Sequence, residues 1–232
     1  MKETMVLIPG FANNALVWKH QMEHLSDLFE IRVILMEKES TRKKMVESLL
    51  KEMPERFVLA GHSMGGWIAQ AAAAAAPKRI SKLILLNTWA TADPKVIYLQ
   101  RQIVEALKRG RLADVMQQHM TLLVHPTRRK DPALMQTLRT MVESFPLEVL
   151  VRQMEAMLED YSSLHLHHSI NAPTLVVHSH DDALFPAKEL QSIATGIRNA
   201  QLEIIEGVGH TSTLEKPEAV TALIRTFLES NS

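Results

Sequence analysis

The sequence holds one serine in the setting that a nucleophile requires. Ser63 is the centre of a G-x-S-x-G motif, Gly61-His62-Ser63-Met64-Gly65, which lies between an apolar run and a helical pattern. A sharp strand-to-helix turn would lift the serine out of a sheet, and the flanking glycines would let the backbone pass without a Cβ clash. The motif indicates a nucleophile; a glycine-rich turn with a capping serine is the structural alternative.

A serine hydroxyl is a poor nucleophile at neutral pH, so a base must lie elsewhere in the chain. Of the eleven histidines, His210 is the best placed, because it follows the last strand-like run and precedes the final helical pattern. His62 adjoins the serine, but one residue before the turn its side chain should point away. We expect His210 to be the base and His62 to be buried packing.

The carboxylate that orients the base should follow a strand between Ser63 and His210. Asp181 and Asp182 both follow an apolar run directly, and Asp93, after the preceding strand, is a distant third candidate. The residues alone leave Asp181 and Asp182 in competition for this position.

An acyl-transfer site also needs donors for an oxyanion. One predicted donor is the backbone N–H of Met64, directly after the nucleophile. The loop after the first strand, residues 8–13, should supply the other, and we expect the N–H of Phe11 to do so. The two loops would flank the ligand crevice of an open sheet if the first and third strands are adjacent.

Short runs rich in valine, isoleucine and leucine recur between helical patterns. Such runs, apolar on both faces, predict buried parallel strands and an α/β fold. The predicted strands are residues 5–8, 31–36, 57–60, 83–86, 174–178 and 202–205. The predicted helices between and after them are residues 16–29, 41–53, 65–76, 187–197 and 213–229.

One interval, from Trp89 to about Leu166, contains no strand-like run of useful length. Its pattern predicts four helices, two of which begin with an aspartate before a proline. They are residues 94–109, 112–124, 132–144 and 147–160. A helical block inserted between two strands predicts a cap, so we divide the chain into a core of residues 1–91 and 166–232 and a cap of residues 92–165.

Together these motifs resemble the α/β-hydrolase superfamily, specifically its cap-bearing, esterase-like serine hydrolases, over nearly the whole chain. The matching segments are Pro9-Gly10-Phe11 with Trp18 downstream, residues 61–66, Asp182 with Pro186, and residues 207–210. The resemblance implies a three-layer α/β-hydrolase fold, with a mostly parallel sheet of about six strands and a helical cap inserted before the strand that precedes the catalytic Asp. It also implies a triad of Ser63, Asp182 and His210, which favours Asp182 over Asp181.

The sequence departs from the family pattern at the edges of the site. Pro9-Gly10 stands where the family usually has His-Gly, and the usual first antiparallel hairpin has no counterpart. The usual Asp-x-Pro-Gly-His-Gly loop is replaced by residues 36–40. Because that loop often borders the active site, we expect its loss to widen one side of the pocket.

The expected reaction is hydrolysis of a carboxylic ester through an acyl-enzyme. Ser63 would attack the ester, His210 would take its proton and Asp182 would steady the imidazolium. Carbon–carbon hydrolases, lactonases and thioesterases would use the same residues, and the sequence does not separate them from an esterase. A binding protein that kept the fold without the chemistry is another class, against which so complete a triad argues.

The substrate pocket should lie between the core and the cap. We expect its lining to include Phe11, Trp89, Leu184 and Phe185. Six cap methionines sit mostly at helical spacing; they should fill the core of the cap, and in a sharper hypothesis some line an adaptable apolar pocket. They are Met116, Met120, Met135, Met141, Met154 and Met157.

We expect no metal and no cofactor. The chain has no cysteine, which excludes thiol nucleophiles and cysteine-bound zinc. His20 and His24 are four apart on a predicted helix, but no third ligand is near them. The other histidines considered form a loose cluster without zinc-protease spacing. They are His165, His167, His168, His178 and His180.

The charge pattern bears on partners. Lys plus Arg number 26 and Asp plus Glu number 26, so the chain lacks the basic excess of a nucleic-acid binder or an anionic-membrane binder. Residues 95–139 carry nine basic and three acidic residues (+6), whereas residues 140–165 carry one basic and five acidic residues (−4). Such runs are usually solvated faces; the sharper hypothesis is that the basic half receives an acidic carrier protein that bears an acyl ester.

The location of the protein is predicted from two absences in the sequence. No run of 18 apolar residues is present and no leader is evident, so we expect a cytoplasmic protein. The sequence leaves the oligomeric state open.

Overall fold

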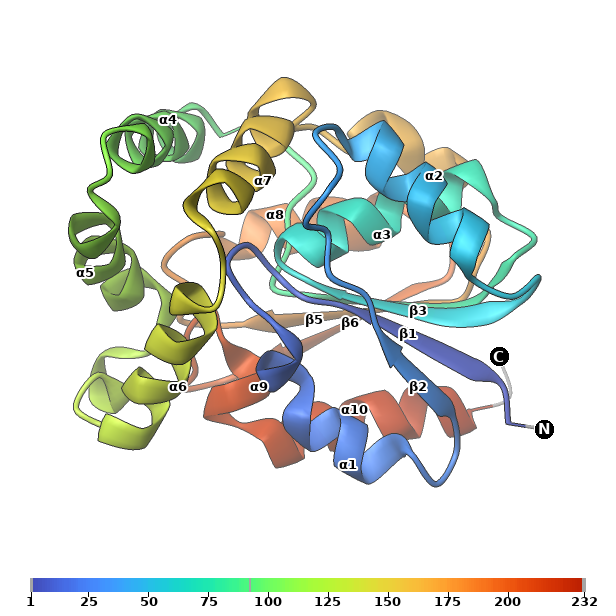
Figure 1. Ribbon diagram of the computed structural model, residues 1–232. Helices are drawn as coiled ribbons and strands as arrows, with labels where there is room; N and C mark the ends of the chain where they lie inside the picture. The colour runs from blue at the N-terminus through green and yellow to red at the C-terminus, as the bar shows by residue number, and fades with distance from the viewer. Residues whose placement is uncertain (1, 92, 231–232) are drawn as a thin grey trace.

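The computed structural model describes residues 2–91 and 93–230, and for residues 117 and 118 the backbone alone. It has a central sheet between two layers of helices, with a further group of helices at one end (Figure 1). The first residue of the predicted cap, residue 92, lies outside the described residues, as do residues 1 and 232 at the limits of the predicted core. The division into core and cap at these residues stays a prediction.

All six predicted runs form strands, and the six strands pair in parallel in the order β2-β1-β3-β4-β5-β6. The strands are β1 (Thr4–Ile8), β2 (Glu30–Val33), β3 (Phe57–His62), β4 (Ile80–Leu86), β5 (Thr174–Ser179) and β6 (Ala200–Ile205). Every residue of β1, β3 and β5 is buried, as expected for strands covered on both faces. The mostly parallel sheet inferred from the resemblance is therefore confirmed.

Strand β2 is shorter than the apolar pattern of residues 31–36 predicts. It lies at the edge of the sheet, and within the described ranges it pairs with β1 alone. Val33 pairs with Leu7, and the N–H of Ile34 donates to the carbonyl of Leu7. Because β1 ends at Ile8, residues beyond Ile34 have no strand to pair with and turn away.

Helices cover both faces of the sheet (Figure 1). One face carries α2 (Arg42–Glu52), α3 (Met64–Ala75) and α8 (Ala187–Gly196), and the other carries α1 (Lys19–Leu25) and α10 (Pro217–Glu229). The buried apolar side chains accordingly form two clusters, one on each side of the sheet. Among the described residues, no helix combines the length and apolar character that crossing a membrane requires.

Two of the helices predicted around the core are divided. The pattern of residues 16–29 becomes a 3-10 turn, Ala15–Trp18, followed by α1, and the pattern of residues 213–229 becomes α9 (Ser212–Glu215) followed by α10. Lys216 separates α9 from α10 with φ −137° and ψ 62°. The ring of Pro217 disfavours helical geometry at the residue before it, which accounts for this break.

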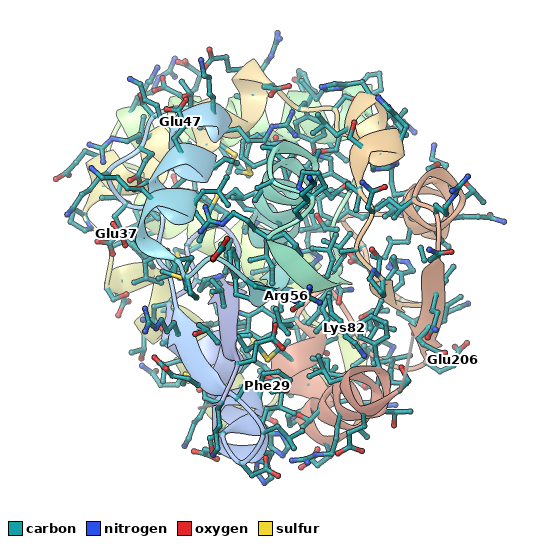
Figure 2. The ribbon with its side chains drawn as sticks, turned by 90° about the vertical axis from the view of Figure 1, so that its right-hand side faces the viewer. Phe29, Glu37, Glu47, Arg56, Lys82 and Glu206 are labelled. Atoms are coloured by element: carbon teal, nitrogen blue, oxygen red, sulfur yellow. The ribbon has the colours of Figure 1, made fainter. Side chains whose placement is uncertain are left out.

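The amino ends of the strands lie on the side opposite to the cap. Figure 2 views the molecule from that side, with Phe29 before β2, Arg56 before β3 and Lys82 near the start of β4. The ammonium of Lys82 donates to the carbonyls of Phe227, Leu228 and Ser230. These bonds satisfy carbonyls that the C-terminal end of α10 leaves free.

All four predicted cap helices are present between β4 and β5. They are α4 (Pro94–Lys108), α5 (Leu112–Leu123), α6 (Pro132–Glu143) and α7 (Leu147–Glu159). Short 3-10 turns, Pro126–Arg128 and Leu164–Ser169, complete the segment. Asp93 and Asp131 cap α4 and α6 through their carboxylates, as the Asp-Pro pattern predicts. The cap helices lie beyond the carboxyl ends of the strands (Figure 1).

A buried arginine joins the end of the cap to the core. Arg42 is 3% exposed, and its guanidinium donates to Asp160 at 2.9 and 2.5 Å, to Ser163 Oγ at 2.8 Å and to the carbonyl of Ser162 at 3.1 Å. The same guanidinium lies 4.9 Å from the ring centroid of Trp67. Helix α2 therefore holds the segment that returns from the cap to β5.

Replacing Arg42 with methionine should destabilise the protein by about 2 kcal/mol, because buried acceptors lose their donors. Asp160 is 52% exposed and regains water, which limits the loss. Urea unfolding followed by circular dichroism measures this free energy. The matched control is Arg32→Met, which removes an ion pair with Glu30 whose members are 43% and 55% exposed and should cost less than about 0.5 kcal/mol. Equal losses in the two variants would contradict the anchoring role of Arg42.

Candidate active site

The sheet topology opens a crevice at the carboxyl ends of β1 and β3. From β1 the chain proceeds to β2 on one side, whereas β3 lies on the other side and leads on to β4. Connections that leave neighbouring strands in opposite directions leave the space between them open for a ligand. The loops of the predicted nucleophile and the predicted oxyanion donor both border this point.

Ser63 occupies a strained turn between β3 and α3. Its φ of 53° and ψ of −117° are unusual for a residue with a side chain, and such strain costs on the order of 1–3 kcal/mol. A Cβ added at Gly61 would lie 2.2 Å from the carbonyl oxygen of Gly65, and one added at Gly65 would lie 2.0 Å from that of Ile8. Both glycines of the motif are therefore required by close backbone contact, as the sequence predicts.

The loop after β1 lies directly against the serine. A Cβ added at Gly10 would be 3.1 Å from Ser63 Cβ, so the backbone at Gly10 packs closely against the serine. Phe11 is the next residue of this loop. Ala12 adopts a positive φ of 56°. The structure thus brings the loop of Phe11 and the start of α3 at Met64 together, as expected from adjacent first and third strands.

His210 and Asp182 meet in the interior. The two residues are 2% and 9% exposed, and His210 Nδ1 lies 2.8 Å from Asp182 Oδ2. The other carboxylate oxygen, Oδ1, accepts the backbone N–H groups of Leu184 at 2.9 Å and Phe185 at 3.1 Å. This arrangement fixes the ring of His210 and leaves its Nε2 to face away from the carboxylate.

Asn87 supports the carboxylate, and the sequence analysis did not find it. It is fully buried just after β4, and its Nδ2 donates to Asp182 Oδ2 at 3.0 Å and to Ser179 Oγ at 2.9 Å. Its Oδ1 accepts the hydroxyl of Ser212 at 2.6 Å. Asn87 also has a positive φ of 45°, a conformation that asparagine tolerates better than most residues. An asparagine after a central strand is the only signal that the sequence offered.

Several donors keep Asp182 ionised. Burial alone would raise the pKa of Asp182, but the charge and hydrogen bond of His210, with the donors on Asn87 and Leu184, hold that pKa below its ordinary value of 3.8. A carboxylate beside the imidazole stabilises the protonated form of the ring, which a general base needs.

The two other acids considered from sequence lie elsewhere. Asp181 Oδ1 lies 3.2 Å from His180 Nδ1, and its Oδ2 accepts the N–H of Gly207 at 3.1 Å. Asp93 accepts the N–H of Lys95 at the start of α4. Of the three acids, Asp182 is therefore the one that contacts His210.

His62 is buried packing, as expected. It is 1% exposed, its Nε2 lies 3.0 Å from the carbonyl oxygen of His210, and the two rings are 5.1 Å apart. Burial, and secondarily the charge of His210, lower the pKa of His62 to about 3. A neutral His62 therefore donates Nε2–H to this carbonyl and helps to hold the loop that carries His210.

Glu215, which the sequence analysis also missed, organises the same loop. It is 4% exposed and accepts the N–H of Gly209 and the hydroxyl of Thr211, the two residues that flank His210. Its other oxygen accepts the N–H of His125 from the cap at 2.9 Å. One carboxylate thus couples the position of His210 to the end of α5.

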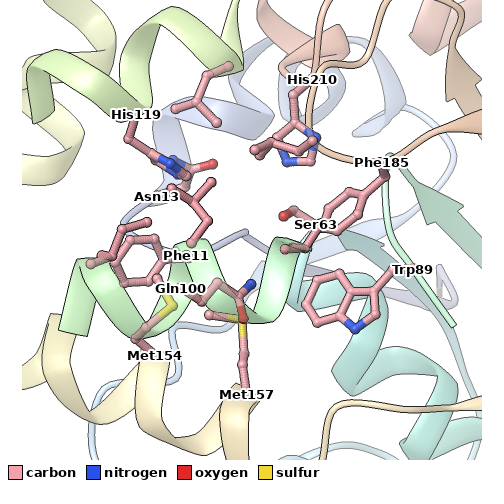
Figure 3. A pocket seen from close by; sticks show the side chains of 15 residues that line it. Phe11, Asn13, Ser63, Trp89, Gln100, His119, Met154, Met157, Phe185 and His210 are labelled. Carbon is pink, nitrogen blue, oxygen red and sulfur yellow. The ribbon is translucent and has the colours of Figure 1, made fainter. Parts of the chain in front are cut away.

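A small cavity of about 40 Å³ lies between core and cap, and the side chains of Ser63 and His210 both face it (Figure 3). In the described part of the chain, the Ser63 hydroxyl makes no hydrogen bond with His210. Such bonds often tighten only when a substrate is bound. All four predicted pocket residues line the cavity: Phe11, Trp89, Leu184 and Phe185.

The cap contributes lining residues that the sequence analysis did not select, apart from the general hypothesis about methionines. The apolar ones are Val96, Leu99, Ile103, Leu123, Met154 and Met157. Only two of the six methionines considered are among them, and the other four pack in or against the apolar clusters. The polar lining residues are Asn13, Ser63, Gln100, His119 and His210.

Comparison with known proteins identifies the family. Residues 45–217, about three quarters of the chain, match the family described as “alpha/beta hydrolase fold”. The chain belongs to the α/β hydrolase fold family. The match and the fold together describe a hydrolase of the α/β class, and both expectations drawn from the resemblance, the fold and the family, are confirmed.

Individual relatives of this α/β hydrolase carry different names. A protein from Caulobacter sp. (strain K31) named “Putative carbamate hydrolase RutD” is 27% identical over all of the chain and 92% of the relative. A poly(3-hydroxyalkanoate) depolymerase from Ectopseudomonas oleovorans is 33% identical, over 73% of the chain and 59% of the relative. The structure of a thermophilic esterase from Thermogutta terrifontis is 28% identical, with a TM-score of 0.87 over 98% of this chain and 90% of that one.

Helix α7 of the cap packs against the two segments where the sequence departs from the family pattern. Gln153 of α7 accepts the N–H of Ala12 in the loop after β1 and donates to the carbonyl of Met36, where the usual loop after β2 is missing. Arg152 donates to the carbonyl of Glu37. None of residues 36–40 lines the cavity. The expected widening on this side is therefore wrong, because α7 packs over the shortened loop.

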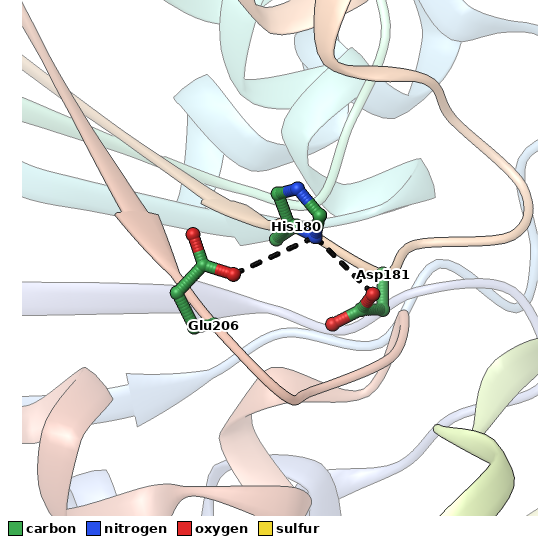
Figure 4. A group of neighbouring side chains, drawn as sticks. All are labelled: His180, Asp181 and Glu206. Carbon is green, nitrogen blue, oxygen red and sulfur yellow. Dashed lines mark hydrogen bonds and ion pairs between the residues drawn. The ribbon is translucent and has the colours of Figure 1, made fainter.

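One group of possible metal ligands occurs in the described part of this α/β hydrolase. His180, Asp181 and Glu206 lie together outside the cavity (Figure 4). The three side chains form an ion-pair cluster on the surface. The hydrogen bond to Asp181, and then the charges of Glu206 and Asp181, raise the pKa of His180. The expectation that the protein holds no metal stays a prediction.

Three of the other histidines considered as ligands, His20, His24 and His167, have hydrogen-bond partners of their own. The rings of His20 and His24 stack at 3.9 Å, and their Nδ1 atoms bond to Thr221 Oγ1 and to the carbonyl of His20. His167 is buried and bonds to Gln70 at 2.8 Å.

His62 should make the stability of the protein depend on pH. Its folded-state pKa of about 3 lies below the ordinary 6.5, so the unfolded chain binds the proton more readily and stability falls as the pH drops below 6.5. In His62→Gln, which keeps a donor, the loss of unfolding free energy between pH 7 and pH 5 should be smaller by about 2 kcal/mol. Urea titrations at several pH values measure this difference. If the unfolding free energies of the two proteins depend on pH in the same way, His62 is not buried in its neutral form.

Proposed function

We propose that this α/β hydrolase cleaves carboxylic esters by acyl transfer through Ser63. One observation carries the proposal: the Ser63 hydroxyl and the His210 imidazole face one mostly apolar cavity, and the far nitrogen of that imidazole is held by the buried carboxylate of Asp182. Nucleophile, base and orienting acid are the three parts that nucleophilic catalysis by serine requires.

In the first half of the reaction, Ser63 Oγ attacks the ester carbonyl while His210 Nε2 takes the hydroxyl proton. Asp182 stabilises the imidazolium that forms. The backbone N–H groups of Phe11 and Met64 donate to the oxyanion of the tetrahedral intermediate. Its collapse breaks the bond to the alcohol oxygen, which receives the proton from His210, and leaves an acyl group on Ser63.

In the second half, water replaces the alcohol. His210 takes a proton from the water as the water oxygen attacks the acyl carbonyl, and the same N–H groups hold the second oxyanion. Collapse returns the proton to Ser63 and releases the carboxylic acid. A cavity of about 40 Å³ has room for about three water-sized groups, so it suits a short acyl chain of about two to four carbons.

One relative supports an ester as the substrate, whereas others are named for carbamates. The esterase from Thermogutta terrifontis resembles this chain over nearly the full length of both proteins. Lactones, thioesters, carbamates and carbon–carbon bonds would call on the same nucleophile and base, so they belong in the same substrate panel.

An acidic carrier protein stays a prediction from the charge pattern. Arg128 bonds to the carbonyl of Glu215 and to Asp131, and Arg129 bonds to the carbonyl of Val124. Two cap arginines thus already make intramolecular hydrogen bonds, and the proposed function does not include a carrier protein.

The test is a series of p-nitrophenyl esters of increasing acyl length, with wild type and Ser63→Ala. Wild type should hydrolyse the acetyl to butyryl esters fastest, and the variant should lose about 10⁴-fold or more in kcat because nothing replaces the nucleophile. The control is Ser26→Ala, an exposed serine between α1 and β2 that does not line the cavity, which should retain wild-type rates. Equal rates in wild type and Ser63→Ala would contradict the nucleophile assignment.

A further inference from the structure

Two polar side chains from the cap interrupt the apolar wall of the cavity. Gln100 of α4 and His119 of α5 line it together with Ser63 and His210 (Figure 3). The proposed ester hydrolysis uses neither of them. A polar group in such a wall costs free energy unless it is hydrogen-bonded. Each of the two side chains is therefore expected to have a hydrogen-bond partner.

Gln100 has a buried amide with one free end. The residue is 8% exposed, and its Nε2 lies 3.4 Å from the hydroxyl of Tyr161, a long hydrogen bond. Its Oε1 is buried and has no hydrogen-bond partner among the described residues. An amide oxygen left in this state costs about as much as a lost hydrogen bond, and a ligand that donates to it would recover that cost.

His119 presents a second unpartnered atom. Its Nδ1 is buried without a hydrogen-bond partner in the described ranges, and its ring packs edge-on against Phe11 with centroids 6.1 Å apart. Burial, and then the charge of His210, lower the pKa of His119 to about 4. The imidazole is therefore neutral at pH 7 and offers one donor and one acceptor.

The remaining lining residues restrict which ligand group would fit. Among the described residues that line the cavity, none is Lys, Arg, Asp or Glu. A carboxylate or an ammonium group on the substrate would be buried there without an opposite charge, at a cost that a neutral group avoids. A hydroxyl both donates and accepts, so it suits a glutamine oxygen and a neutral imidazole in either tautomer.

We propose that Gln100 and His119 form a polar subsite that selects esters carrying a hydroxyl group near the scissile carbonyl over alkyl esters of the same size. The inference rests on the proposed ester hydrolysis and names the substrate class of that site. The hydroxyl donates to Gln100 Oε1 or exchanges a hydrogen bond with His119, while the methionines and aromatic rings of the cavity enclose the carbon chain.

The test uses two pairs of esters that differ by exchange of a hydroxyl for a methyl group. The pair p-nitrophenyl 3-hydroxybutyrate and p-nitrophenyl 3-methylbutyrate places the hydroxyl in the acyl half. The pair 2-hydroxyethyl butyrate and propyl butyrate places it in the alcohol half. Wild type should prefer the hydroxylated member of at least one pair by roughly 10-fold or more in kcat/KM.

Two variants assign that preference to the subsite. Gln100→Met keeps the volume of the side chain and removes the amide, and His119→Phe keeps a ring against Phe11 and removes the nitrogens. Each should reduce the ratio of kcat/KM values within the preferred pair several-fold, by slowing the hydroxylated ester more than the alkyl ester. The matched control is Gln102→Met, an exposed position on the same helix, which should keep the wild-type ratio.

The outcomes separate this inference from the proposed function. Hydrolysis of both pairs with ratios near one in wild type, or ratios that neither variant changes, would overturn the subsite and leave ester hydrolysis standing. Failure of wild type to hydrolyse any of the four esters would defeat the proposed function and the subsite with it. A ratio that falls in the two variants and not in Gln102→Met supports the subsite.

Discussion

The buried carboxylate of Asp182 joins loops that leave three different strands. One oxygen receives His210 from the loop after β6 and Asn87 from the loop after β4, and the other receives the N–H groups of Leu184 and Phe185 after β5. A charge in the interior is tolerated only when its acceptor sites are filled. The three loops must therefore close around this group, and that closure also aims the imidazole at the cavity.

Hydrogen bonds also join the cap to the loops around the site. Gln153 fixes the loop after β1, Glu215 ties the end of α5 to the loop of His210, and Arg42 holds the segment that returns to the sheet. The cap thus closes the cavity and helps to position two of the loops around it. Residues of the cap and of the core line the cavity together, so in the proposed function a bound ester would contact both.

The sequence predicted what depends on local patterns. The turn at Ser63 follows from glycine spacing and strand periodicity, both of which are readable within a few residues. The choice between Asp181 and Asp182 could not be made from local patterns, because both residues follow the same strand. Only the contact with a distant histidine separates them. Asn87 meets Asp182 across 95 positions of the chain, and Gln100 reaches the cavity only through the packing of the cap, so neighbouring residues in the sequence do not predict either contact.

The central claim is that Ser63 is a nucleophile whose reactivity depends on the buried carboxylate of Asp182. Labelling with a fluorophosphonate, followed by peptide-mapped mass spectrometry, tests both parts in one measurement. The account predicts a single phosphonyl group on the peptide that contains Ser63, and much slower labelling of the same peptide in Asp182→Asn. An unlabelled Ser63, or equal labelling rates in wild type and Asp182→Asn, would contradict it.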